Sequence, residues 1–147
     1  MEQGTKKQLT TKLLIAGGAV LLAVALLLVY IFAIPKPVKG EKAFELTITA
    51  DGSSKVIDAS TDAEYLVDLL DELDKKLHLS YEAVDGAYGP MITTINKRVA
   101  DESKNEYWAI YIDGEYGMFG IKEQVMIKAG TDNPDYVMKI ELKLESF

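Results

Sequence analysis

An uncharged run of 22 residues, Leu13–Ile34, constrains this chain more than any other feature. It consists mostly of Leu, Ala, Val and Ile. As a helix that rises about 1.5 Å per residue it would be about 33 Å long, enough to cross a hydrocarbon core of roughly 30 Å. We therefore expect a membrane-spanning helix, followed by a domain that is tethered to the membrane.

The same run could instead be the apolar part of a cleavable signal peptide. Such apolar regions are about 7–15 residues long, and the first and third residues before the cleaved bond are small. The run here is longer, and cleavage after Ala33 would make Ile31, a large residue, the third residue before the cleaved bond. We therefore predict an uncleaved anchor.

The charges that flank the run decide its orientation only weakly. Three lysines precede it and three follow it closely, so the positive-inside rule is nearly balanced. The N-terminal amine adds a positive charge on one side, and long C-terminal domains are translocated largely regardless of charge. We predict a single-pass protein of the cell membrane with its N-terminus inside. The predicted parts are a cytoplasmic tail (1–12), an anchor (13–34), a linker (35–43) and an extracytoplasmic domain (44–147).

The composition of the remaining chain excludes several classes of function. Residues 35–147 carry 13 basic and 22 acidic side chains. This acidic balance argues against binding nucleic acid, and against electrostatic attachment to anionic lipid. The chain has no cysteine, which excludes disulfides, thiolate catalysis and cysteine-ligated zinc.

The first part of the domain is predicted to form two strands and a helix. Apolar and polar residues alternate over 44–50, which is typical of a half-buried strand, and a turn then leads to a second strand at 55–59. Thr61 and Glu64 have the spacing of a capping box, which predicts a helix start there. Leucines recur through Leu77 with helical spacing and predict one apolar face.

The chain beyond residue 78 is predicted to be all strand and loop. Asp113-Gly114 joins two apolar runs, which is a strong hairpin signal. The predicted strands are 81–84, 91–95, 107–112, 115–119, 125–127 and 136–145. The fold class is therefore α+β, a single domain with one helix on a mixed sheet of about five or six strands.

No constellation for catalysis or metal binding is present in the sequence. His78 is the only histidine and follows the predicted helix, where a cation is favoured by the helix dipole. There is no Gly-x-Ser-x-Gly motif and no phosphate-binding glycine loop. Oxygen donors gather at 131–135, but without the spacing of an EF-hand, which favours an ordinary turn. We expect no enzyme, no cofactor and no metal site.

Aromatic residues gather on the predicted hairpin. On its first strand Trp108 points to one face, whereas Tyr107 and Tyr111 point to the other. One of these faces must be core. The other is either covered by more protein or is a platform for a ligand.

Three stretches, 85–96, 107–116 and 120–121, resemble the transcobalamin-like C-terminal domain family, which is common on surface proteins of Gram-positive bacteria and mostly of unknown function. The resemblance implies a β-grasp-like fold. In vitamin B12 carriers such a domain closes over a corrinoid that a larger helical domain holds. Carried over by position, the ligand-binding candidates are Tyr88, Trp108, Tyr111, Tyr116, Met118 and Phe119.

Two functions remain open from the sequence. The first is a membrane-anchored, extracytoplasmic module that captures a small ligand, such as a corrinoid, for a membrane protein or transporter. The second is a protein-interaction or envelope-structural module without a small-molecule ligand.

Overall fold

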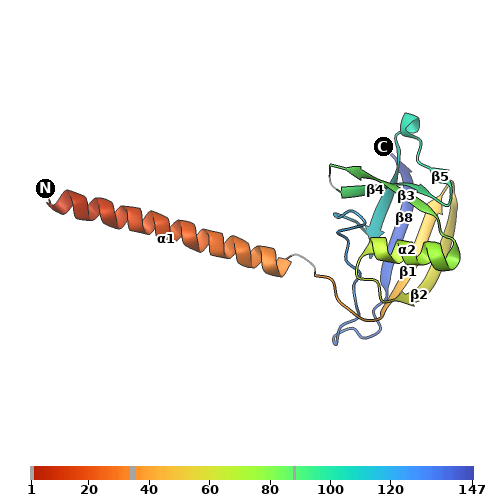
Figure 1. The fold of residues 1–147 in the computed structure, drawn as a ribbon, viewed down its shortest axis with the longest axis horizontal. Coiled ribbons are helices and arrows are strands. Elements are labelled where there is room, and N and C mark those ends of the chain that lie inside the picture. The colour runs from red at the N-terminus through yellow and green to blue at the C-terminus, as the bar shows by residue number, and fades with distance from the viewer. Residues whose placement is uncertain (1, 34–35, 88) are drawn as a thin grey trace. The chain divides into compact units, whose positions relative to one another are not determined.

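The computed structural model describes residues 2–33, 36–87 and 89–147 and divides the chain into two compact units (Figure 1). The first unit ends at Lys36 and contains helix α1 (Glu2–Ala33). Within α1, Gln8–Ala33 is long and apolar enough to cross a membrane by length and composition. The helix begins before the predicted span because the polar N-terminal segment is also helical, and Ile34 lies outside the described residues.

The second unit, Pro37–Phe147, is built on a mixed five-stranded sheet. The strand order is β2-β1-β8-β6-β7, and β1 and β8 are parallel whereas the other neighbours are antiparallel. The strands are β1 (Lys42–Ala50), β2 (Ser53–Thr61), β6 (Glu106–Ile112), β7 (Glu115–Tyr116) and β8 (Met138–Ser146).

A separate antiparallel sheet of three strands contains β3 (Tyr81–Gly86), β4 (Gly89–Ile95) and β5 (Arg98–Val99). The α+β class is confirmed, but the prediction of a single sheet is wrong. Asn96 and Lys97 have φ angles of 47° and 67°, and this tight turn folds the short β5 back onto β4. Sequence patterns indicate strands but not how they are divided between sheets.

Helix α2 (Leu66–Leu77) starts later than its capping box predicts. Thr61 is the last residue of β2, where it pairs with Lys42, so it is not available as a helix cap. The helix is capped at Tyr65 instead, and the Asp68 carboxylate accepts a hydrogen bond from the Tyr65 amide at 3.2 Å.

The loop before β8 supplies further partners for the start of α2. The amides of Leu66 and Val67 donate to the carbonyls of Gln124 and Ile121 at 2.8 and 2.9 Å. These are helix-terminal amides that need partners outside the helix. The predicted strand 125–127 is therefore wrong: within it, only Val125 forms an isolated bridge, to Tyr65. The amides of Glu123 and Gln124 donate to the Gly120 carbonyl at 3.1 and 2.8 Å, which connects this loop to the neighbouring segment 117–120.

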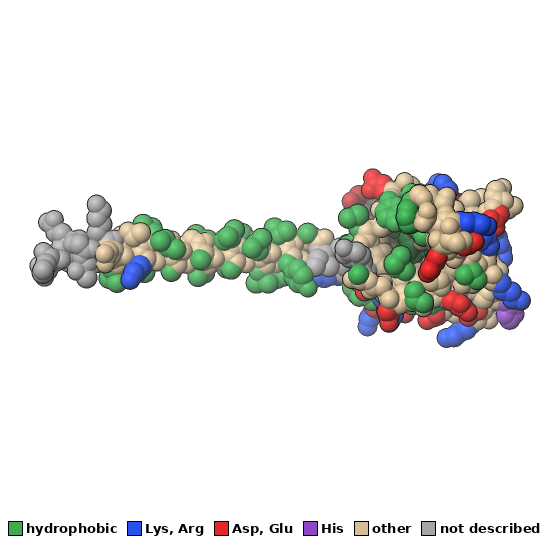
Figure 2. Space-filling view, turned by 90° about the horizontal axis from the view of Figure 1, so that it is seen from above, with side chains coloured by type: hydrophobic (Ala, Val, Ile, Leu, Met, Phe, Trp, Pro, Cys, Tyr) green, Lys and Arg blue, Asp and Glu red, His purple; other side chains and the backbone are tan. Residues whose placement is uncertain are grey.

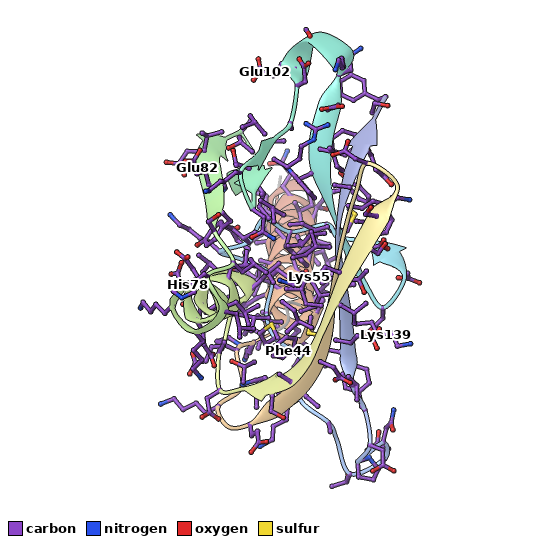
Figure 3. All side chains as sticks on the ribbon, turned by 90° about the vertical axis from the view of Figure 1, so that its right-hand side faces the viewer. Phe44, Lys55, His78, Glu82, Glu102 and Lys139 are labelled. Atoms are coloured by element: carbon purple, nitrogen blue, oxygen red, sulfur yellow. The ribbon has the colours of Figure 1, made fainter. Side chains whose placement is uncertain are left out.

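The core lies between α2 and one face of the five-stranded sheet. Figure 3 shows side chains filling this space, Phe44 among them, while His78 lies on the outer side of the helix and Lys139 beyond the opposite face of the sheet. The core residues on α2 are Leu66, Leu69, Leu70 and Leu73, all below 5% exposed. The predicted leucine face is thus confirmed as a packing face, except at Leu77, the last residue of the helix, which is 52% exposed.

Candidate functional site

The β6–β7 hairpin forms at Asp113-Gly114, as predicted. Both turn residues have positive φ, 51° and 84°, which is the conformation that an Asp-Gly turn favours. β7 ends at Tyr116, however, so the predicted strand 115–119 is too long. The Gly117 amide donates to the Ile110 carbonyl at 2.7 Å, and the chain then leaves the sheet toward α2. Among the described residues, β6 before Ile110 has no strand partner on this edge.

The structure resolves which face of β6 is core. Trp108 is only 6% exposed and belongs to the core cluster, and its indole N–H donates to the Arg98 carbonyl at 3.3 Å. Tyr107 and Tyr111 lie on the opposite face, are half-buried, and are not covered by any helix of the second unit within the described residues. The exposed face of the hairpin is therefore the tyrosine face.

The tyrosine face is held by one carboxylate. Glu145 accepts hydrogen bonds from the hydroxyls of Tyr107 and Tyr111 at 3.0 and 2.9 Å. The bond to Glu145 raises the pKa of Tyr111 to about 12, with burial adding to it. Burial raises the pKa of Glu145, but the hydrogen bonds from Tyr111 and Tyr107, together with the ion pair to Lys143 at 3.3 Å, leave that pKa below its ordinary value. The Tyr111 ring also packs edge-on against Tyr116, with ring centroids 5.6 Å apart.

A hollow of about 250 Å³ lies along the unpaired edge of β6; we call it the β6 hollow. Its lining comes from β4, β6 and the chain after β7. Met118 and Phe119 are 86% and 44% exposed, and Met91 from β4 is 54% exposed. Figure 2 shows hydrophobic side chains gathered on one face of the domain beside acidic ones. The lining residues are Pro90, Met91, Ile92, Tyr107, Trp108, Ile110, Tyr116, Gly117, Met118, Phe119 and Gly120.

Most of the predicted site residues come together at this hollow. Trp108, Tyr116, Met118 and Phe119 line it, and Tyr111 lies beside it against the Tyr116 ring. Tyr88 lies outside the described residues.

The β4 residues of the lining were not predicted from the sequence. Pro90 and Met91 belong to the other sheet, and they reach the hollow because β4 lies beside β6. No local sequence signal marks such a long-range approach.

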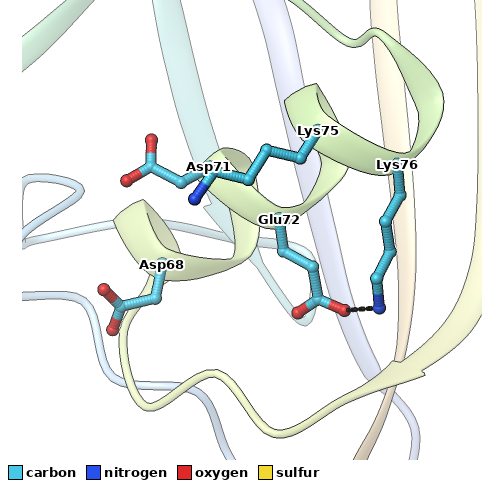
Figure 4. A pocket seen from close by; sticks show the side chains of 5 residues that line it. All are labelled: Asp68, Asp71, Glu72, Lys75 and Lys76. Atoms are coloured by element: carbon cyan, nitrogen blue, oxygen red, sulfur yellow. Dashed lines mark hydrogen bonds and ion pairs between the residues drawn. The ribbon is translucent and has the colours of Figure 1, made fainter.

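A second depression, of about 370 Å³, lies on the polar face of α2 (Figure 4). Its lining is entirely charged and includes an ion pair between Glu72 and Lys76 at 2.7 Å. Among the described residues, no group of three or more His, Asp and Glu side chains is placed to hold a metal ion. This depression has the features of a solvated helix face.

Comparison with known proteins places the domain among others of the same fold. Residues 63–132 match the family model described as a domain of unknown function, DUF4430. The structure is similar to that of a Ruminococcus gnavus protein described as a candidate metal binding protein, with a TM-score of 0.58 and 26% sequence identity. The similarity covers 72% of this chain and 98% of that chain. No curated protein matches the chain.

The structure is also similar to haptocorrin, which was crystallised in complex with Cbi. The TM-score is 0.61 and the sequence identity is 12%, and the similarity covers 75% of this chain and 26% of that chain. At this identity the likeness concerns the fold alone. The predicted resemblance to transcobalamin-like domains is confirmed.

Proposed function

We propose that this chain is a membrane-anchored, extracytoplasmic binding module whose β6 hollow receives an apolar part of a small ligand. The observation that carries this proposal is the exposure of Met118, Phe119 and Met91 around a concave site floored by Trp108. Apolar side chains gathered at the surface in this way mark binding sites in soluble domains. α1 is the proposed anchor, with its N-terminus inside the cell.

The size of the hollow indicates one half of a binding site. Pockets that enclose a drug-sized ligand measure about 300–1,000 Å³, whereas the β6 hollow measures about 250 Å³ and is open. A ligand as large as a corrinoid would be covered on one side only. We propose that a membrane protein or transporter covers the other side, and that the module binds its ligand without transforming it.

The fold similarity supports a corrinoid as the first ligand to test. Haptocorrin was crystallised with Cbi, and one helix on a mixed sheet also agrees with the β-grasp-like arrangement implied by the family resemblance. Because the likeness concerns only the fold, the identity of the ligand has to be supported by the side chains that line the hollow.

An interaction module is the second candidate function, and one observation favours it. Met118 projects into solvent rather than lining an enclosed space, and Val84 and Met91 pair side by side on the neighbouring sheet, each more than half exposed. Such a patch could pack against another protein.

The test is a titration of the isolated domain, residues 37–147, with cobinamide. Trp108 is the only tryptophan and lines the hollow, so its fluorescence is a probe next to the bound ligand. We expect quenching in the wild-type domain and at least about tenfold weaker binding after Met118→Ala with Phe119→Ala, because buried apolar contacts at a binding site are worth about 1–3 kcal/mol each.

The matched control is Val56→Ala, which removes an exposed apolar side chain from β2, at the far edge of the five-stranded sheet. It should bind cobinamide like the wild type. If the wild-type domain shows no quenching and no calorimetric signal with cobinamide, corrinoid binding is contradicted and the interaction module is favoured.

A further inference from the structure

Lys42, the first residue of β1, is buried without a counter-ion. It is 1% exposed and lies on the same face of the strand as Phe44 and Leu46. Its ammonium group donates to the Gly40 carbonyl at 2.8 Å. An ammonium has three hydrogens to donate, and no carboxylate forms an ion pair with Lys42 within the described ranges. A buried charge is costly when it is not paired.

A second ammonium group lies against the same glycine. A methyl group placed on Gly40 would lie 2.8 Å from Lys128 Nζ, and the φ angle of Gly40, 101°, already excludes most side chains. Lys39 is adjacent in sequence and exposed. Lys39 and Lys128, like Lys42, form no ion pair with any residue that the structure describes. We call Lys39, Lys42 and Lys128 the lysine cluster.

The lysine cluster lies where the domain chain begins. α1 ends at Ala33 and the domain begins at Pro37. Three intervening residues span at most about 11 Å when fully extended. If α1 is the proposed anchor, Lys39 and Gly40 are therefore within reach of the lipid headgroups, whose characteristic anion is phosphate.

We propose that the lysine cluster binds the phosphate of an anionic lipid headgroup. The exposed Lys39 and Lys128 contact the phosphate, and its negative charge offsets that of the buried Lys42 ammonium from the surface. The acidic balance of the whole domain argues against electrostatic attachment to anionic lipid. At this end, however, the exposed Lys39 and Lys128 outnumber the one exposed carboxylate next to them in sequence, Glu41. This inference rests on the proposed function in one respect, that α1 anchors the domain at the membrane. The residues of the lysine cluster are separate from those of the β6 hollow.

The test uses the domain 37–147, which contains the entire described core. The similarity to the Ruminococcus gnavus protein covers 98% of that chain but 72% of this one, which supports a domain of this fold as a unit without α1. We expect the domain to sediment with vesicles of phosphatidylcholine and phosphatidylglycerol, but not with phosphatidylcholine alone, and to be released by salt. Lys39→Gln with Lys128→Gln should weaken this binding at least about tenfold, since each lysine near an anionic surface contributes about 1 kcal/mol.

The matched control is Lys76→Gln with Lys104→Gln, which removes the same charge from lysines that already have carboxylate partners. It should bind vesicles nearly as the wild type does. An equal loss of vesicle binding in both double variants would overturn the assignment, because binding would then depend on the net charge of the domain alone.

A second variant tests the buried charge itself. Lys42→Met keeps an unbranched side chain, one atom shorter than that of lysine, and removes its charge. In the absence of phosphate, we expect the variant to melt at the same temperature as the wild type or at a higher one. Added inorganic phosphate should raise the melting temperature of the wild type but not that of the variant. A lower melting temperature of the variant would show that Lys42 is already satisfied and would contradict the proposal.

Two further results would overturn the lipid assignment. The first is a wild-type domain that binds no anionic vesicles and is not stabilised by phosphate. The second is stabilisation by inorganic phosphate without vesicle binding, which would assign the site to free phosphate. Either result leaves cobinamide binding at the β6 hollow untouched.

Discussion

Trp108 belongs to two environments. Its ring packs in the core, its indole N–H is bonded to the Arg98 carbonyl, and its small exposed fraction forms part of the β6 hollow. Two of the remaining predicted residues, Met118 and Phe119, differ from it because they contribute to the hollow from an exposed loop. A single residue therefore couples the stability of the fold to the shape of the site.

Replacement of this residue should affect folding more than binding. Trp108→Ala is expected to lower the free energy of unfolding by about 3–5 kcal/mol, because it leaves a large cavity in the core. Urea denaturation followed by circular dichroism measures this. A loss below about 1 kcal/mol would contradict the placement of Trp108 in the core.

Glu145 should make the fold sensitive to acid. Its pKa is lower in the folded domain than its ordinary value of 4.5, so the ionised form stabilises the fold above that value. This contribution is lost as the pH falls through the folded-state pKa. The free energy of unfolding of Glu145→Gln should therefore change less between about pH 6 and about pH 3 than that of the wild type.

Urea denaturation at both pH values measures this difference. Other carboxylates with lowered pKa values, such as Glu72, are unchanged by the substitution and affect both proteins alike. An identical pH dependence in the two proteins would show that the ionised Glu145 is not stabilised by its partners Tyr107, Tyr111 and Lys143.

At the scale of elements, the two sheets are joined through Arg98. Its guanidinium pairs with Asp51, in the β1–β2 turn, at 2.9 Å and with Glu106, the first residue of β6, at 3.1 Å. The hydrogen bonds from Arg98 hold the pKa values of Asp51 and Glu106 below their ordinary range. This one side chain connects β5 to the sheet that carries the β6 hollow.

Loss of this connection should loosen the smaller sheet selectively. In Arg98→Met, amide hydrogen exchange is expected to accelerate in β3–β5 and at the start of β6 more than in β1 and β8. Lys104→Met, which changes a neighbouring exposed lysine, serves as the control. Uniform acceleration over all strands would contradict a local connecting role.

The sequence was sufficient for features that depend on local chemistry. The Asp113-Gly114 hairpin and the leucine face of α2, apart from the exposed Leu77, were predicted correctly, because turn conformation and helical period are properties of neighbouring residues. The start of α2 was not, because strand pairing occupies Thr61 and distant carbonyls satisfy the first helical amides. The same limit applies to the β6 hollow: its hairpin residues were predicted, but Met91 arrives through contact between the two sheets.

At the scale of the whole molecule, the chain combines an apolar helix with a domain that has its own core. The domain exposes apolar side chains at the β6 hollow, and it exposes Lys39 and Lys128, which form no ion pair with any described residue. In the proposed mode of action, the helix supplies attachment, the lysine cluster holds a lipid headgroup, and the hollow takes one side of a ligand that a membrane partner completes.

The most direct test of the ligand site is an NMR titration of the isotope-labelled domain 37–147 with cobinamide. We predict amide shift changes in residues 89–92 and 107–120, which surround the β6 hollow, and none along β2 at the far edge of the sheet. An unchanged spectrum at saturating cobinamide, or changes confined to another face of the domain, would contradict ligand binding at the β6 hollow.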